Sequence, residues 1–365
     1  MTSKDIKFTN YELFAMVVTA LLSQILTIHP TNFIKNAGSA SVIIFILVTF
    51  IIYLIYKFIL NTMLKKEYDF FTLLRNTYSK TTLKFIGSFL YIYFFLGAVI
   101  FTLNISLQLK VMTYTLSPVY TIAIYILIGA FLGSIKGLSP LFKIVGYIFP
   151  FLFIYLVFIF LMSLPFFEYH NFLPLLGNGM KESILYNLPN LSMFAPLISF
   201  IIFTKNNKTR KDRRKNKRIF KYIIITFGVC MICAIITFLN TMPLRLIATR
   251  LILLFDINRM LSQLPSAQKL EPLLIFVYSM ISFVCIGFSI LCACLSFEKT
   301  NIVASYSSYI LPSFIILGLF TFVPINMEFI YMISNIFSYV SLFTFIVLPL
   351  FSILKYKYKE RKNEL

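Results

Sequence analysis

The chain has 365 residues, of which 59% are hydrophobic and only 13% are charged, and its formal net charge is +20. A soluble domain carries about 45–50% apolar and about 25% charged residues, so this composition excludes a soluble enzyme. A membrane-spanning helix needs about 20 apolar residues, and the chain supplies such runs along nearly its whole length.

The apolar runs predict an all-α fold with about ten transmembrane helices in a single polytopic domain over residues 1–365. The expected helices cover residues 10–30, 41–62, 84–109, 118–135, 141–163, 182–204, 219–240, 269–297, 303–323 and 329–354. The runs are continuous rather than alternating, which argues against a transmembrane β-barrel. The first run lacks a small-residue cleavage pattern, so we interpret it as a retained helix and not as a signal peptide.

The basic residues support this layout, because cytoplasmic loops of membrane proteins are rich in Lys and Arg. If the N-terminus lies in the cytoplasm, few basic residues fall on the outer side of the membrane. They are Lys35, Lys110, Lys181, Arg245, Arg250, Arg259 and Lys269. Both termini are therefore expected in the cytoplasm. The densest basic run, residues 205–218, joins two helices directly, so we interpret it as a topology anchor on anionic lipid and expect no nucleic-acid partner.

Two further segments allow more than one interpretation. Residues 244–264 are too polar to span, and they fit either a helix lying on the membrane interface or a lid over an outward-facing cavity. Cys230 and Cys233 have the spacing of metal ligands, but they lie in an apolar run without a nearby histidine. We interpret them as packing residues and expect neither a metal nor a cofactor.

Two predicted helices are interrupted near mid-membrane. Helix 10–30 carries Ser23 and Gln24 ahead of His29-Pro30, and helix 182–204 carries Asn187, Pro189, Asn190, Ser192 and Pro196. Proline removes a backbone donor, and the groups that it frees can bind a small zwitterion, although such prolines also merely kink packed helices. The two helices are five apart, which predicts two inverted repeats of five helices with the first and sixth helices discontinuous.

Other polar residues at depth are weaker candidates for the same cavity. They are Tyr278, Ser279 and Ser282 in helix 269–297, and Thr102 and Asn104 in helix 84–109. Serines in membrane helices often bond their own backbone or a neighbouring helix instead. The two histidines, His29 and His170, are isolated, and we find no catalytic or nucleotide-binding motif.

Three motifs give the whole chain a family resemblance. They are Leu21-Leu-Ser-Gln-Ile-Leu-Thr-Ile-His-Pro30 followed by Asn36-Ala-Gly38, Asn171-Phe-Leu-Pro174 with Gly177 and Gly179, and Gln268-Lys-Leu-Glu271-Pro-Leu-Leu-Ile-Phe-Val-Tyr278. In these motifs the chain resembles the endospore germination permeases, the B subunits of germinant receptors, in the amino acid–polyamine–organocation transporter superfamily. It departs from that family in having no tryptophan, so Ser39-Ala-Ser41 stand where an aromatic residue is usual.

The resemblance implies a LeuT-like fold and a role as a sensor in the inner spore membrane. Such a sensor binds a small germinant, for example an amino acid, and signals through an A subunit and a lipoprotein C subunit. The alternative is a secondary active transporter of amino acids or cations, which would need the same cavity. A membrane-embedded enzyme is a third hypothesis, and it lacks an identifiable catalytic motif.

Overall fold

The computed structural model describes residues 6–363 apart from residues 28, 67, 113, 115, 173–178, 205–209, 250–252, 262–269 and 324–326. Within these residues the chain forms helices and connecting turns without a strand, which confirms the all-α prediction.

The first half of the described chain builds five spans, and the first of them is broken. This span consists of α1 (Asn10–Leu22) with the 3-10 helix η2 (Ser23–Leu26), followed by α2 (His29–Ala37). The other spans are α3 (Ser41–Lys65), α5 (Lys80–Met112), α6 (Val119–Ser134) and α7 (Leu138–Ser163). A short helix, α4 (Phe70–Thr77), lies between α3 and α5, and Asp69 caps it by accepting a hydrogen bond from the Thr72 amide.

The second half repeats this plan, again with a broken first member. Its broken span consists of α8 (Met180–Tyr186), the 3-10 helix η6 (Pro189–Phe194) and α9 (Leu197–Phe203). It is followed by α10 (Arg210–Thr241), α13 (Leu270–Lys299), α14 (Ile310–Phe320), α15 (Met327–Leu342) and α16 (Leu348–Asn363). Between α10 and α13 lie the short helices α11 (Leu244–Thr249) and α12 (Leu253–Leu261). A π-helical turn, Phe343–Val347, joins α15 to α16 in one final span.

Long and short spans together account for the predicted number of helices. Within the described residues, six helical segments are long and apolar enough to cross a membrane. Four shorter apolar segments complete the set, namely Asn10–Leu26, Val119–Ser134, Pro189–Phe203 and Tyr306–Phe320. The short members include both broken spans, because each break divides an apolar run that would otherwise form one long helix.

The structure differs from the sequence expectation at several helix ends. The first helix was expected to end at Pro30, but Pro30 lies in the first turn of α2, where a helix tolerates proline. Helix α10 begins at Arg210 rather than at residue 219. Apolarity marks only the part of a helix that lies in hydrocarbon, so a helix that continues into water extends beyond its apolar run. Of the segment 244–264, the described parts form α11 and α12.

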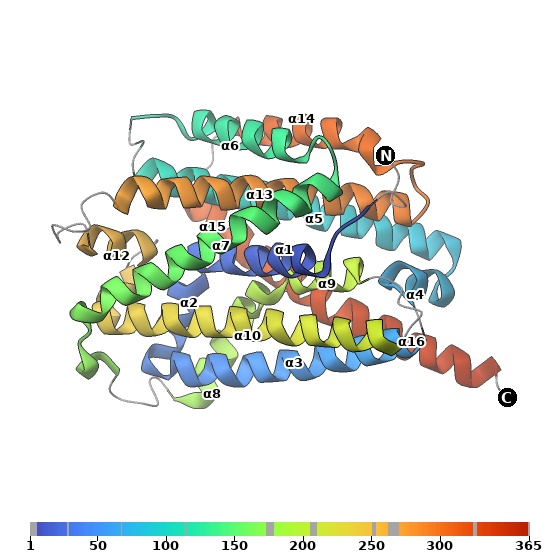
Figure 1. Cartoon of the computed structure of the whole chain (residues 1–365), viewed down its shortest axis with the longest axis horizontal. Coiled ribbons are helices and arrows are strands. Elements are labelled where there is room, and N and C mark those ends of the chain that lie inside the picture. Colours follow the sequence, from blue (N-terminus) through green and yellow to red (C-terminus); the bar gives the residue numbers. More distant parts are fainter. Residues whose placement is uncertain are drawn as a thin grey trace.

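The two halves are arranged with inverted symmetry. In each half a short helical segment follows the second span, namely α4 after α3 and α11–α12 after α10. Figure 1 shows α4 and α12 at opposite ends of the molecule, and it shows α3 and α10 running side by side. A pair of inverted repeats requires this placement, because equivalent segments of the two halves must lie at opposite membrane surfaces.

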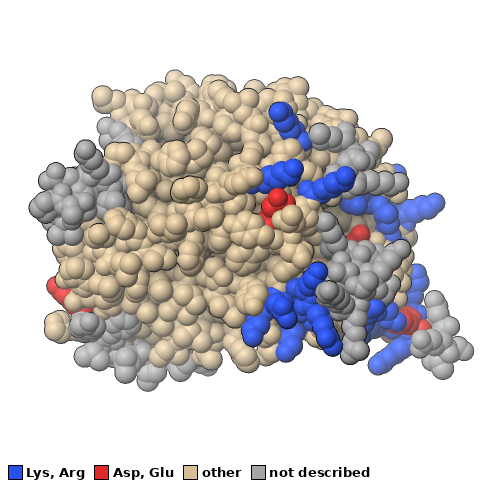
Figure 2. Space-filling view, in the orientation of Figure 1, with Lys and Arg blue, Asp and Glu red and all other residues tan. Residues whose placement is uncertain are grey.

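Charged residues are distributed unequally between the two ends of the molecule at which α4 and α12 lie. On the face shown in Figure 2, Lys and Arg gather toward the end of the molecule where Figure 1 places α4, α16 and the two marked termini. We call this end the basic end. The segregation agrees with the distribution that the positive-inside rule predicts, and the assignment of this end to the cytoplasm stays a prediction.

Small residues allow the central helices to pack closely. A Cβ atom added to Gly87 of α5 would lie 2.0 Å from the Oγ1 atom and 2.6 Å from the Cβ atom of Thr300, which directly follows α13. A Cβ atom added to Gly287 of α13 would lie 3.2 Å from both the Ala130 carbonyl oxygen and the Ser134 Cβ atom of α6. In lipid the hydrophobic effect does not favour the association of helices, because the acyl chains are as apolar as the side chains. Close packing therefore contributes much of the free energy of helix association.

The contact at Gly87 predicts a packing defect on substitution. Gly87→Ala should destabilise the protein by about 1–3 kcal/mol, because the new methyl group overlaps the Thr300 side chain. Gly133→Ala in α6 is the matched control, since a Cβ atom there has no neighbour within 4 Å. The melting temperature in detergent should fall for the first variant only, and equal melting temperatures would contradict the packing account.

Candidate functional site

A cavity of about 170 Å³ lies among the two broken spans and three other helices. Its walls come from α1, η2 and α2, from α5, from η6 and α9, from α13, and from α15. Pockets for drug-sized ligands occupy about 300–1,000 Å³, so this cavity suits a smaller guest. Helix α5 runs away from the basic end, and its lining residues extend from Tyr93 to Asn104. The cavity therefore lies from mid-depth toward the opposite end.

The break in the first span is stabilised by side chains that replace backbone hydrogen bonds. Thr27 has extended backbone angles, φ −98° and ψ −172°, which end η2. Its hydroxyl donates to the Gln24 carbonyl at 2.7 Å, and the Ser23 hydroxyl donates to the Ala20 carbonyl at 2.8 Å. The Tyr278 hydroxyl of α13 donates to the Leu26 carbonyl at 3.3 Å. The carbonyls exposed by the break are thus partly satisfied from within the protein.

The break in the sixth span is tied to the first by two asparagines. Asn187 follows α8, and its amide donates to the Ser183 carbonyl at 2.9 Å and to the Phe33 carbonyl of α2 at 3.4 Å. In return, the Asn36 amide of α2 donates to the Tyr186 carbonyl at 2.8 Å. We call this pair of reciprocal contacts the asparagine link. The asparagine link therefore joins the two broken spans directly.

Two buried polar atoms of the cavity wall have no hydrogen-bond partner among the described residues. They are the Ser192 Oγ atom of η6, in a residue that is 6% exposed, and the His29 Nδ1 atom at the start of α2. A buried polar atom without a partner costs about 1–3 kcal/mol. A polar guest in the cavity would remove that cost, so the two atoms favour a site for a hydrogen-bonding ligand.

The described lining contains no Asp, Glu, Lys or Arg. Its polar members carry hydroxyl or amide groups, together with one histidine and one cysteine. Burying an ion of net charge against such a wall would be costly, because the wall offers no counter-charge. The arrangement can therefore hold a small solute without net charge by hydrogen bonds and through the ends of the broken helices.

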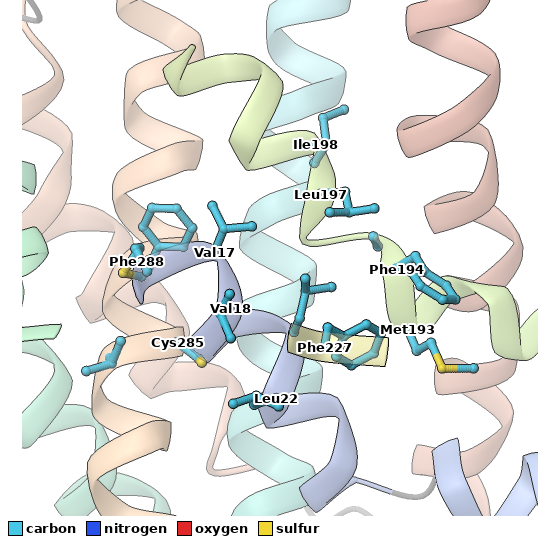
Figure 3. Close-up of a cluster of buried hydrophobic side chains, with 14 of the residues drawn as sticks. Val17, Val18, Leu22, Met193, Phe194, Leu197, Ile198, Phe227, Cys285 and Phe288 are labelled. Carbon is cyan, nitrogen blue, oxygen red and sulfur yellow. The ribbon is translucent and has the colours of Figure 1, made fainter. Parts of the chain in front are cut away.

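Toward the basic end, packed aromatic side chains lie next to the cavity. Phe288 of α13 lines the cavity and also contacts Phe142 and Phe203, with ring centroids 6.0 Å and 5.7 Å apart. Phe8 stacks on Phe142 at 4.7 Å. We call these four rings the aromatic floor. Figure 3 shows Phe288 beside Val17 of α1, within the buried apolar cluster that extends to η6 and α9.

The structure brings some of the sequence-predicted site residues to the cavity and leaves others outside it. Ser23, Gln24, Asn190 and Ser192 line it, as does the weaker candidate Asn104. Asn187 lies behind the wall and accepts a hydrogen bond from the Asn190 amide at 2.9 Å.

Thr102, Tyr278, Ser279 and Ser282 do not line the cavity, and the hydroxyls of three of them donate to backbone carbonyls. The Tyr278 hydroxyl is bonded to the first break, as described above. The Thr102 hydroxyl donates to the Ala98 carbonyl at 2.7 Å, and the Ser282 hydroxyl donates to the Tyr278 carbonyl at 2.6 Å. A binding role for any of the predicted residues stays a prediction.

One wall of the cavity was not foreseen from the sequence. Helix α15 contributes Ser334, Ser338 and Ser341, whose spacing places them on one helical face. The Asn104 amide donates to the Ser334 hydroxyl, and the Tyr93 hydroxyl donates to that of Ser341, each at 3.4 Å. The spacing of these three serines, which we call the serine stripe, was the sequence pattern that could have indicated a polar face on α15. The missed residues at the first break are Thr27, His29 and Asn32.

Solved structures with a similar fold are membrane transporters. Mhp1, a nucleobase-cation-symport-1 family transporter in a closed conformation with bromovinylhydantoin bound, matches with a TM-score of 0.63 and 9% identity over 96% of this chain and 78% of its own. A manganese transporter mutant from Eremococcus coleocola matches with a TM-score of 0.60 and 12% identity over 98% of this chain and 83% of its own. At such identities the likeness shows the fold alone, and it confirms the predicted LeuT-like architecture.

The family assignment comes from the sequence. No curated protein matches the chain. Residues 7–330, however, match the model of the family described as spore germination protein, a stretch that includes both broken spans and most of the cavity wall. Together with the apolar spans and the transporter fold, this match shows that the chain is an integral membrane protein with a permease-like architecture and that it belongs to the spore germination protein family.

Proposed function

We propose that this chain is the B subunit of a germinant receptor, a permease-like sensor in the inner membrane of a dormant spore. A small germinant without net charge, such as an amino acid, binds in the cavity between the broken helices. Binding is signalled through the A and C subunits of the receptor. The observation that carries the proposal is the uncharged, polar lining at both helix breaks in a member of the spore germination family.

The broken helices supply partial charges that suit a zwitterion. The first turn of α2 contributes His29 and Asn32 to the cavity wall, and a helix N-terminus favours a carboxylate. The wall across the break contains Ser23 and Gln24, close to the C-terminal end of the first half-helix, and such an end favours an ammonium group. A guest with both charges would thus lie across the first break.

The same wall argues against a divalent cation as the guest. Manganese and similar ions prefer carboxylate and other oxygen ligands, and the described lining contains no carboxylate. The lining hydroxyls and amides are better suited to an organic solute with several hydrogen-bonding groups.

Signalling requires a ligand to bind two states of the receptor with different affinity. The asparagine link provides a route, because a guest that draws Ser192 and His29 together pulls on two half-helices that Asn36 and Asn187 already join. In this conformation the aromatic floor lies between the cavity and the basic end, an arrangement compatible with binding from the opposite side.

Transport is the alternative function, and one experiment separates it from sensing. The purified chain in liposomes should bind a radiolabelled germinant amino acid without accumulating it. Uptake driven by an ion gradient, in the absence of any other subunit, would replace the sensor proposal by a secondary transporter that uses the same cavity.

A substitution at Ser192 tests the position of the binding site. Ser192→Ala should raise the germinant concentration for a half-maximal germination response by about two- to tenfold, because one hydrogen bond to the guest is lost. The matched control is Ser282→Ala, since Ser282 is also buried but donates to a carbonyl of its own helix. Dose–response curves of spores that carry each variant supply the measurement. Unchanged thresholds for Ser192→Ala, or an equal rise for Ser282→Ala, would place the site elsewhere.

Cysteine labelling tests the orientation of the chain in the membrane. Lys217 and Arg245 are exposed residues near opposite ends of α10, and we expect Lys217 in the cytoplasm and Arg245 outside. In a background without the five native cysteines, Arg245→Cys should react with a membrane-impermeant maleimide in intact cells. Lys217→Cys should react only after permeabilisation. Labelling of both residues from the same side would contradict the proposed topology.

A further inference from the structure

The seam between α3 and α10 carries two hollows that differ in character. The first, which we call the apolar groove, has a volume of about 380 Å³, and its lining includes Phe50 and Tyr53 of α3 and Ile225 and Gly228 of α10. The second, the lysine pocket, has a volume of about 460 Å³ and lies where α16 meets the two helices. Figure 1 shows α3 and α10 side by side, with α16 at the basic end of the pair.

The two hollows follow one another along the same helix faces. Lys221 of α10 lines the apolar groove, and Lys217, one helical turn earlier on the same face, lines the lysine pocket. On α3, Tyr53 lines the groove and Asn61, two turns further on, lines the pocket. The groove therefore leads into the pocket.

The lysine pocket has an excess of positive charge. It is lined by Lys65 and Lys66 at the end of α3, Lys217 of α10, and Lys357 and Glu360 of α16. Glu360 forms an ion pair with Lys66, and it is the one carboxylate of the described lining. Lys65, Lys217 and Lys357 are exposed and have no carboxylate partner among the described residues.

The apolar groove is open because a side chain is missing from it. At Gly228 an added Cβ atom would meet only the Thr49 Cγ2 atom, at 3.8 Å. The neighbouring side chains Phe50, Ile225 and Val229 are 58%, 47% and 54% exposed to the surroundings of the protein. In a membrane those surroundings are acyl chains, so the groove offers an acyl chain a fixed position along the two helices.

We propose that this seam binds an anionic phospholipid, with its phosphate in the lysine pocket and an acyl chain along the apolar groove. Lysine ammonium groups bind phosphate as point charges, and basic pockets at the cytoplasmic surface of membrane proteins suit anionic head groups. A soluble phosphate would use the pocket but not the groove. An acidic peptide would likewise leave the apolar groove, which continues the same seam, without an occupant.

The site has a structural consequence for both halves of the protein. Helices α3 and α10 are the second spans of the two inverted halves, and α3 follows the second part of the first broken span. A lipid on this seam contacts one helix from each half, α3 and α10, and so stabilises their relative position. The inference does not depend on the germinant proposal, because the seam shares no described lining residue with the central cavity.

The head group is tested on the purified full-length chain in detergent. Phosphatidylglycerol should raise the melting temperature, whereas phosphatidylcholine with the same acyl chains should not. The double variant Lys217→Gln/Lys357→Gln should weaken phosphatidylglycerol binding on the order of tenfold or more. The control Lys84→Gln/Lys136→Gln removes the same charge from exposed lysines outside the pocket and should leave binding unchanged.

The acyl-chain site is tested without altering charge. Gly228→Phe should fill the groove and weaken phosphatidylglycerol binding several-fold, whereas Gly318→Phe, at a position with no neighbour within 4 Å of an added Cβ, should not. The proposal is overturned if phosphatidylcholine, inorganic phosphate or an acidic peptide raises the melting temperature as much as phosphatidylglycerol. It is also overturned if the variants and their controls lose binding equally.

Discussion

The architecture depends on one constraint, namely that backbone groups freed within a membrane must find partners inside the protein. Two spans of this chain are broken, and side chains within the protein satisfy part of the freed carbonyls. Thr27 and Tyr278 act at the first break, and Asn36 and Asn187 join the two breaks. Of the buried polar atoms that have no partner among the described residues, the His29 Nδ1 and Ser192 Oγ atoms are the two that line the cavity, which favours this cavity as the place where a guest would bind.

The constraint also explains why the cavity carries no formal charge. A charged side chain at this depth would need a buried counter-ion, whereas hydroxyls and amides can bond to backbone carbonyls when no guest is bound. Two lining side chains can also bond to each other, as the Asn104 amide does when it donates to the Ser334 hydroxyl. Such a wall can exchange internal hydrogen bonds for bonds to a ligand, which the proposed sensor function requires, because that function needs two states that lie close in energy.

Two features of the fold could be predicted from the sequence, namely the transmembrane spans and the breaks in two of them. Continuous apolar runs indicated the spans, and the clusters around Pro30 and Pro189 indicated the breaks, because these patterns are local. Which polar groups face the cavity is not a local property. Tyr278 and Ser282 were expected to face it, but they donate to backbone carbonyls. The serine stripe of α15 marks one face of a helix in the sequence, but the sequence does not show that this face lines a cavity built by four other segments. Side-chain direction depends on tertiary packing that a single sequence does not contain.

The lysines of the α3–α10 seam are a second case in which the sequence does not show which side chains lie together. In the sequence they belong to separate basic segments, each of which the positive-inside rule explains fully as a topology signal. The inverted repeat places α3 and α10 side by side and brings α16 to their ends, so Lys65, Lys217 and Lys357 line one pocket next to an apolar groove. Residues that the positive-inside rule explains one segment at a time thereby form a surface whose positive charge and apolar groove are complementary to the proposed anionic phospholipid. The repeat symmetry that creates the central cavity from two broken helices also creates this seam from the two unbroken helices that follow them.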